Sequence, residues 1–240
     1  MKILVAGCSI SSGWGFELEK QDPQIWPNLV AKEFDAEIVN VAQTASSNYD
    51  IFLQTLLAQQ YDNYDVTLVQ WTGLDRITLS SGLDSLIILN NIDPANRSAI
   101  FQHVSPEDLR TFSRVMTVIN NMWKAFADLS RMTQILSRRS SNTYFINGNL
   151  PWTTDFFYNP GHDPFTNFLL SIDTDHKLVR DQIDLIKQNL KADHWINLAH
   201  GWQYSKLDSV SATDIHAGPT SHQFYSQQVI NFLKETQCQI

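Results

Sequence analysis

Three short segments of the chain are apolar at nearly every position. They are KILVAGC at 2–8, EIVNVA at 37–42 and VTLVQW at 66–71. Continuous apolar runs of this length are typical of strands that are covered on both faces, as in parallel sheets. The segments between them have apolar residues at helical spacing, one beginning near Pro27 and the next opening with Asn48 as a candidate N-cap. The pattern therefore predicts alternating strands and helices.

The second half of the chain continues this alternation after an interruption. TYFING at 143–148 and HWINLA at 194–199 are predicted strands, KLVRDQIDLIKQNLKA at 177–192 is a helix between them, and SHQFYSQQVINFLKET at 221–236 is a final helix. Short right-handed crossovers of this kind build a doubly wound sheet. We predict an α/β fold: a three-layer α/β/α sandwich around a five-stranded parallel sheet in flavodoxin-like order.

Two segments do not fit the alternation. Residues 73–142 begin with a Ser- and Asn-rich stretch and continue, after Pro106, with an amphipathic helix from about Glu107 to Arg139, which indicates an insertion. Residues 149–173 are dense in aromatic residues and contain three prolines, which favours an ordered irregular loop. We therefore expect one domain over residues 1–240, with an insertion and an aromatic loop.

Composition and charge restrict the class of protein. With 43% hydrophobic and 18% charged residues the chain has the profile of a packed globular protein. Lys and Arg number 17 and Asp and Glu 25, so the net charge is 17 − 25 = −8, which makes nucleic acid and anionic membranes poor partners. Neither a leader peptide nor a membrane-spanning run is evident, and we expect a soluble, cytoplasmic protein. Cys8 and Cys238 alone form neither a disulfide framework nor a metal site, and we expect no metal or cofactor.

The first candidate for chemistry is Ser9, which directly follows the first predicted strand in GCSISSGWG. Doubly wound folds place their ligand sites at this carboxyl edge of the sheet. As a phosphate-binding loop the segment lacks both the GxGxxG spacing and the Lys-Ser/Thr pair of a P-loop. As a nucleophile, Ser9 needs a base and an acid from elsewhere on the same edge.

A candidate base lies in the polar loop before the last helix. Asp214 and His216 are two residues apart, so in extended chain both side chains point to one face and the carboxylate can orient the imidazole. Such a pair taken alone is more often structural than catalytic. Together with a serine at a strand end it suggests nucleophilic catalysis.

Three segments in this order resemble the conserved blocks of the SGNH (GDSL-type) hydrolase superfamily. They are GCSIS at 7–11, NVAQTASSN at 40–48 and DIHAGPTSH at 214–222. The resemblance implies the following roles: Ser9 is the nucleophile, His216 the base, Asp214 the group that orients it, His222 a structural residue, and the backbone N–H groups of Ser9 and Ala45 the oxyanion hole.

The chain also departs from the pattern of that superfamily. Cys8 replaces the usual Asp, and Asp75 stands where the family has an oxyanion-hole Asn, although a carboxylate cannot donate a hydrogen bond unless it is protonated. Thr72, Arg76 or another group would have to replace that donor. Ala45 replaces Gly, which preserves the N–H group provided that the local φ is negative.

The last block departs as well, because the family places its Asp three residues before the His, where this chain has Thr213. Two arrangements remain open: Asp214 orients His216 from two residues away, or the site is a Ser-His dyad that a backbone carbonyl orients.

The implied activity is that of a serine esterase or acyl-transfer enzyme acting on a small O-acylated molecule, with carbohydrates among the candidates. Asp75, Thr72 and Trp152 are the expected substrate-binding residues, although loop aromatics such as Trp152 are more often part of the loop's own core. The alternative is a non-catalytic binding or interaction module that has lost the oxyanion-hole Asn. The sequence does not indicate the oligomeric state.

Overall fold

The computed structural model describes residues 1–73, 77–80, 86–89, 122–148, 194–196, 206–214 and 216–237. Two predicted elements, the helix at 177–192 and the aromatic loop at 149–173, lie outside these residues. The division into one domain with an insertion stays a prediction for the same reason.

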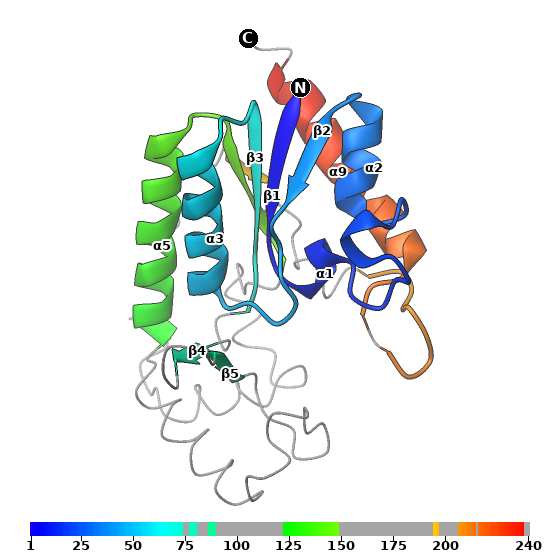
Figure 1. The fold of residues 1–240 in the computed structure, drawn as a ribbon, viewed down its shortest axis with the longest axis horizontal. Coiled ribbons are helices and arrows are strands. Elements are labelled where there is room, and N and C mark those ends of the chain that lie inside the picture. The colour runs from blue at the N-terminus through cyan, green and yellow to red at the C-terminus, as the bar shows by residue number, and fades with distance from the viewer. Residues whose placement is uncertain are drawn as a thin grey trace, which may run out of the picture.

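The described chain is organised around a five-stranded parallel sheet (Figure 1). Its strands are β1 (Lys2–Ala6), β2 (Glu37–Asn40), β3 (Val66–Trp71), β6 (Thr143–Asn147) and β7 (Trp195–Ile196), in the order β2-β1-β3-β6-β7. All four pairings are parallel. The order is that of flavodoxin-like sheets, so the predicted topology is confirmed.

Helices cover both faces of this sheet, and each face has its own apolar core (Figure 1). The helices α2 (Trp26–Glu33) and α9 (Pro219–Gln237) pack together on one face, and α3 (Asn48–Tyr61) and α5 (Met122–Arg139) on the other. The first core includes Ile3, Val5, Trp26, Val30, Tyr225 and Val229, and the second includes Ala6, Ile51, Val69, Leu129, Leu136 and Phe145. Successive strand residues point to opposite faces, so Val5 and Ala6 enter different cores. The three-layer sandwich is confirmed.

Two details differ from the prediction. A two-stranded antiparallel sheet of β4 (Ile77–Ser80) and β5 (Leu86–Leu89) lies within the segment that we expected to be an insertion. The N-cap of α3 is Ser47 and not Asn48. The Ser47 hydroxyl accepts a hydrogen bond from the N–H of Asp50, and the Asp50 carboxylate accepts one from the N–H of Ser47. This capping box uses the acidic residue three positions after the cap, a pairing that an N-cap at Asn48 could not make.

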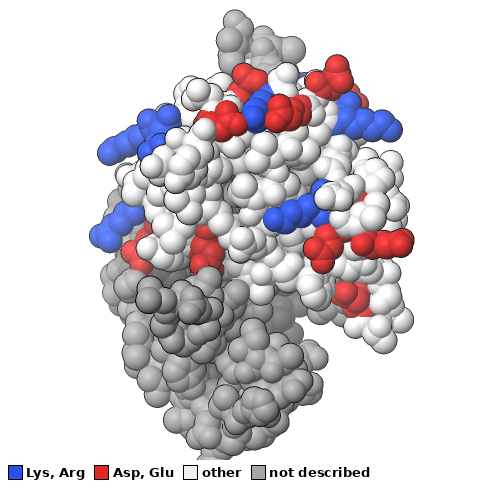
Figure 2. Space-filling model, viewed as in Figure 1, with Lys and Arg blue, Asp and Glu red and all other residues white. Residues whose placement is uncertain are grey.

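Charged side chains of both signs gather at the amino edge of the sheet, whereas much of the middle of the face in Figure 2 is uncharged. At that edge Lys2 forms ion pairs with Glu37 and Asp62. No helix in the described part of the chain is long and apolar enough to cross a membrane. The described residues also contain no group of three or more His, Cys, Asp or Glu side chains that could hold a metal ion.

His222 joins the two helices that cover one face of the sheet. Its ring is 1% exposed, and its Nδ1 atom accepts a hydrogen bond of 3.0 Å from the N–H of Trp26, the first residue of α2. Phe16 packs edge-on against the ring. Burial lowers the pKa of His222 to about 4, although the nearby carboxylates of Asp208 and Asp22 act in the opposite direction. These contacts agree with the structural role that the resemblance implied.

The low pKa of His222 predicts a loss of stability in mild acid. Between pH 6.5 and about pH 4 the unfolded chain binds a proton at this residue and the folded chain does not. The free energy of unfolding should therefore decrease as the pH falls through this range, by about 3.5 kcal/mol in total at roughly 1.4 kcal/mol per pH unit.

The measurement is chemical denaturation at several pH values of the protein and of His222→Asn. The Asn Oδ1 atom can accept the bond from Trp26 but does not titrate in this range. We expect a smaller pH slope for the variant, and an unchanged slope would assign the acid sensitivity to other groups.

Candidate active site

The first site residue, Ser9, begins the short helix α1 (Ser9–Ser12) directly after β1 and Cys8. The helix ends after one turn because Gly13 is left-handed (φ +73°) and donates its N–H to the Ser9 carbonyl. This turn holds Ser9 at the carboxyl edge of the sheet, where its side chain is 5% exposed. Among the described residues none forms a hydrogen bond with its hydroxyl.

Two polar side chains near the carboxyl ends of β2 and β3 form contacts with α1 and with Cys8, the residue before it. Gln70, fully buried at the end of β3, contacts the hydroxyl of Ser11 and donates to Cys8 Sγ over 3.5 Å. Asn40, the last residue of β2, donates to the carbonyl of Ser11 over 2.8 Å. Sequence reasoning missed Gln70, although a polar residue near the end of an apolar strand is a signal that could have identified it. Asn40 opens the block quoted at 40–48, but it was given no role there.

The end of β3 is fixed to the start of α3 by two hydrogen bonds of Asn48. Its Nδ2 atom donates to the carbonyl of Thr72 over 3.1 Å, and its Oδ1 atom accepts the N–H of Thr72 over 2.8 Å. Thr72 is 1% exposed. Its backbone N–H and carbonyl groups therefore connect β3 to α3. A contact between its side chain and a substrate stays a prediction.

The predicted base and acid lie in direct contact. Asp214 Oδ1 is 2.6 Å from His216 Nδ1 and also accepts the backbone N–H of His216 at 3.0 Å. These two bonds hold the pKa of the Asp214 carboxyl below its usual range. The carboxylate therefore keeps the proton of the neutral ring on Nδ1, which leaves Nε2 free to accept a proton. Both side chains are about one third exposed, at 28% for Asp214 and 32% for His216.

The loop that carries this pair is fixed to the start of α9. Asp208 caps the helix, accepting the N–H groups of Thr220 and Ser221 and the Ser221 hydroxyl. Although partial burial raises the pKa of Asp208, these hydrogen bonds outweigh it and lower the pKa to about 2. Within the loop the N–H of Val210 donates to the carbonyl of His216 over 2.9 Å. The backbone around His216 is thus held on both sides.

Contacts between the residues that follow α1 and this loop bring Ser9 and the Asp214–His216 pair to the same end of the sheet. The N–H of Trp14 donates to the Ser9 carbonyl over 3.0 Å, and the Trp14 ring lies 6.1 Å from the His216 ring between centroids. Gly15 approaches Asp214 so closely that a Cβ atom on it would lie 3.1 Å from Oδ2. No hydrogen bond between Ser9 and His216 is present among the described residues, and their catalytic contact stays a prediction.

Solved structures that share this arrangement of strands and helices include an esterase. The esterase EstA from a Pseudoalteromonas species, in a structure inhibited by monoethylphosphonate, matches with a TM-score of 0.52 at 12% identity over 98% of both chains. TesA matches with a TM-score of 0.53 at 13% identity over 98% of this chain and 99% of its own. The chain therefore has the same fold as these two proteins. No family model matches the sequence, and no curated protein matches it either.

Ala45 lies at the position where the SGNH resemblance places an oxyanion-hole glycine. Its φ of +65° is in the left-handed region, so the condition attached to this replacement, a negative φ, is not met. At Ala45 the turn from β2 to α3 therefore has a backbone conformation that glycine adopts with a lower conformational energy than alanine. Among the described residues no group accepts a hydrogen bond from the N–H of Ala45, and its role as an oxyanion donor stays a prediction.

Replacing Ala45 with glycine should stabilise the protein, because an L-residue in the left-handed region is strained. We expect a gain of about 1 kcal/mol, which for a chain of this size corresponds to roughly 2–4 °C in Tm. Thermal unfolding measures it. Ala58→Gly within α3 is the matched control, since the same change in a regular helix should cost about 1 kcal/mol. A decrease for both variants would contradict strain at Ala45.

Three residues of the predicted SGNH site, Asp75, Arg76 and Trp152, lie outside the described residues. Whether Asp75 faces the oxyanion position and whether Trp152 contacts substrate therefore stay predictions.

Proposed function

We propose that this protein is a divergent SGNH hydrolase, a serine esterase or acyl-transfer enzyme that acts on a small O-acylated molecule. The observation that carries the proposal is the 2.6 Å contact between Asp214 and His216, on a loop that packs against the residues following Ser9. A carboxylate that orients an imidazole beside a serine at a sheet edge is the arrangement of a serine hydrolase.

The proposed reaction assigns a step to each group. His216 Nε2 takes the proton of the Ser9 hydroxyl as Oγ attacks the ester carbonyl, and the N–H groups of Ser9 and Ala45 stabilise the oxyanion. When the C–O bond to the alcohol breaks, His216 returns the proton to the leaving oxygen. Water, or an acceptor alcohol in the transfer reaction, then attacks the acyl-enzyme with His216 again as the base, and His216 returns this proton to Ser9 Oγ as the bond between Oγ and the acyl group breaks.

A fluorophosphonate reagent tests the proposal without knowledge of the substrate. The activated serine displaces fluoride and keeps the phosphonyl group, which adds a known mass to the protein. We expect a single adduct that peptide mapping places on Ser9, and none in Ser9→Ala. Slower labelling of His216→Ala would identify the base.

No labelling of the native protein, or labelling of another serine, would contradict the proposal, and the absence of any adduct is what the non-catalytic binding module predicts. A series of nitrophenyl esters with short acyl chains, assayed with and without an added alcohol, then distinguishes hydrolysis from transfer.

A further inference from the structure

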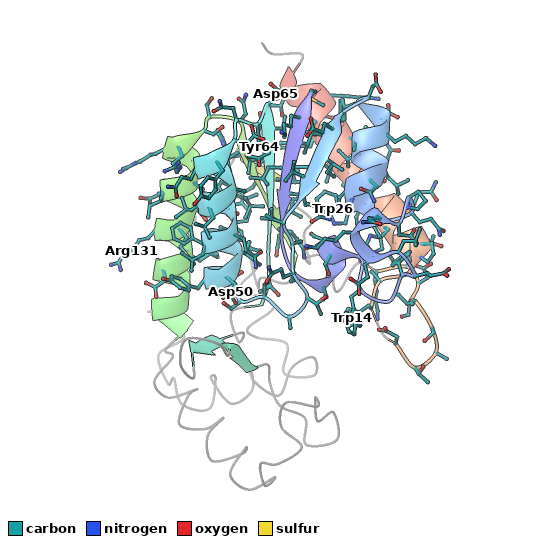
Figure 3. All side chains as sticks on the ribbon, viewed as in Figure 1. Trp14, Trp26, Asp50, Tyr64, Asp65 and Arg131 are labelled. Carbon is teal, nitrogen blue, oxygen red and sulfur yellow. The ribbon has the colours of Figure 1, made fainter. Side chains whose placement is uncertain are left out.

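Trp14 exposes a large aromatic side chain beside the Asp214–His216 pair. The residue is 42% exposed, and its ring is tilted by 55° to that of His216 at 6.1 Å between centroids. In Figure 3 it lies at the carboxyl edge of the sheet, next to the loop that carries the pair. An indole left in water at this place offers an apolar, planar surface within reach of the site.

The backbone holds Trp14 in this position on both sides. Gly13 (φ +73°) and Gly15 (φ +89°) are both left-handed. A Cβ atom on Gly13 would lie 2.7 Å from the Glu19 carbonyl oxygen, and one on Gly15 would lie 2.9 Å from a Val210 methyl group. The backbone of the turn is therefore fixed between two neighbouring segments. Binding of a ligand to the ring then costs little additional conformational entropy of this backbone.

The position of His216 indicates which part of a substrate lies against Trp14. In an acyl-transfer reaction the base returns its proton to the leaving alcohol, so the alcohol oxygen must lie within hydrogen-bond distance of His216. A group attached to that oxygen extends past the imidazole, where the indole stands. The acyl group, in contrast, is bonded to the carbonyl carbon that faces Ser9.

We infer that Trp14 is a specificity-determining residue that binds the alcohol part of the substrate. We also infer that this part carries a ring with an apolar face. The inference rests on the proposed function. A ring packed against an indole gains contact area and a favourable stacking geometry, whereas a short alkyl alcohol gains little.

The test compares two esters that have the same acyl group, phenyl acetate and ethyl acetate. The ratio of their kcat/KM values reports alcohol recognition, because intrinsic reactivity cancels when the same ratio is compared between native protein and variant. In Trp14→Ala we expect this ratio to fall about 3- to 10-fold, mainly through the KM of phenyl acetate, since one aromatic contact is worth a factor of that size. Trp14→Phe should keep most of the ratio.

Tyr61→Ala is the matched control, because Tyr61 is an exposed aromatic at the far end of α3. It should leave the ratio unchanged. An equal loss for both esters in Trp14→Ala would mean that the ring only supports His216, and would overturn the inference while leaving the proposed function intact.

Binding measurements keep the inference testable if neither of these two model esters is hydrolysed although the fluorophosphonate labels Ser9. In the Ser9→Ala background, ligand-observed NMR compares the affinities for phenyl acetate and ethyl acetate with and without Trp14→Ala. Preferential binding of phenyl acetate that depends on Trp14 supports the inference, and its absence overturns it.

Discussion

Replacing Ser9 with alanine should lower kcat/KM for ester hydrolysis by at least about 10⁴-fold, the size of effect seen when the nucleophile of a serine hydrolase is removed. The Ser9 hydroxyl forms no hydrogen bond among the described residues, so its loss should cost the fold little. Steady-state rates with a short-chain nitrophenyl ester and a thermal unfolding curve measure the two effects separately.

Ser12→Ala is the control for this experiment. Ser12 is buried in the same short helix, and its hydroxyl donates to the Ser9 carbonyl and contacts Thr44. We expect this variant to lose about 1 kcal/mol of stability and to retain its activity within a few-fold. A Ser9→Ala protein that still hydrolyses esters at the native rate would show that another group is the nucleophile.

The sheet could be predicted from the sequence because parallel strands buried on both faces leave a strong signal. The run at 66–71 matches β3 at both ends, and the helix predicted near Pro27 is α2. The β4–β5 pair could not be predicted in the same way. Each of its strands has only four residues, ITLS and LIIL, and periodicity gives weak evidence for strands this short.

The candidate site was predicted less completely than the fold. Asp214 and His216 could be paired from their spacing because the contact is local in sequence. The support of α1 by Gln70, and the joining of Thr72 to Asn48, connect residues far apart in the chain. The left-handed conformation of Ala45 could not be read from its residue type, since alanine disfavours it. Such features depend on tertiary packing.

The second large effect that we expect is a loss of activity when Asp214, two residues before His216, is replaced. The structure places the Asp214 carboxylate on His216 Nδ1, whereas Thr213 stands where SGNH hydrolases have their Asp, and its hydroxyl contacts Ser211 over 3.2 Å. If Asp214 serves as the acid of the site, Asp214→Asn should lower kcat by about 10³–10⁴-fold. Thr213→Ala should change it by less than about twofold, as expected for an exposed side chain.

The physical reason for the Asp214 effect is the position of one proton. The carboxylate can only accept, so it holds the proton of the neutral ring on Nδ1 and leaves Nε2 as the base. An Asn side chain can present its NH₂ group to Nδ1, which moves the ring proton to Nε2 and removes the base without changing the packing. Kinetics of both variants, with unfolding curves as a check on the fold, separate this cause from a general loss of structure. Full activity of Asp214→Asn would instead favour a Ser-His dyad in which another group orients His216.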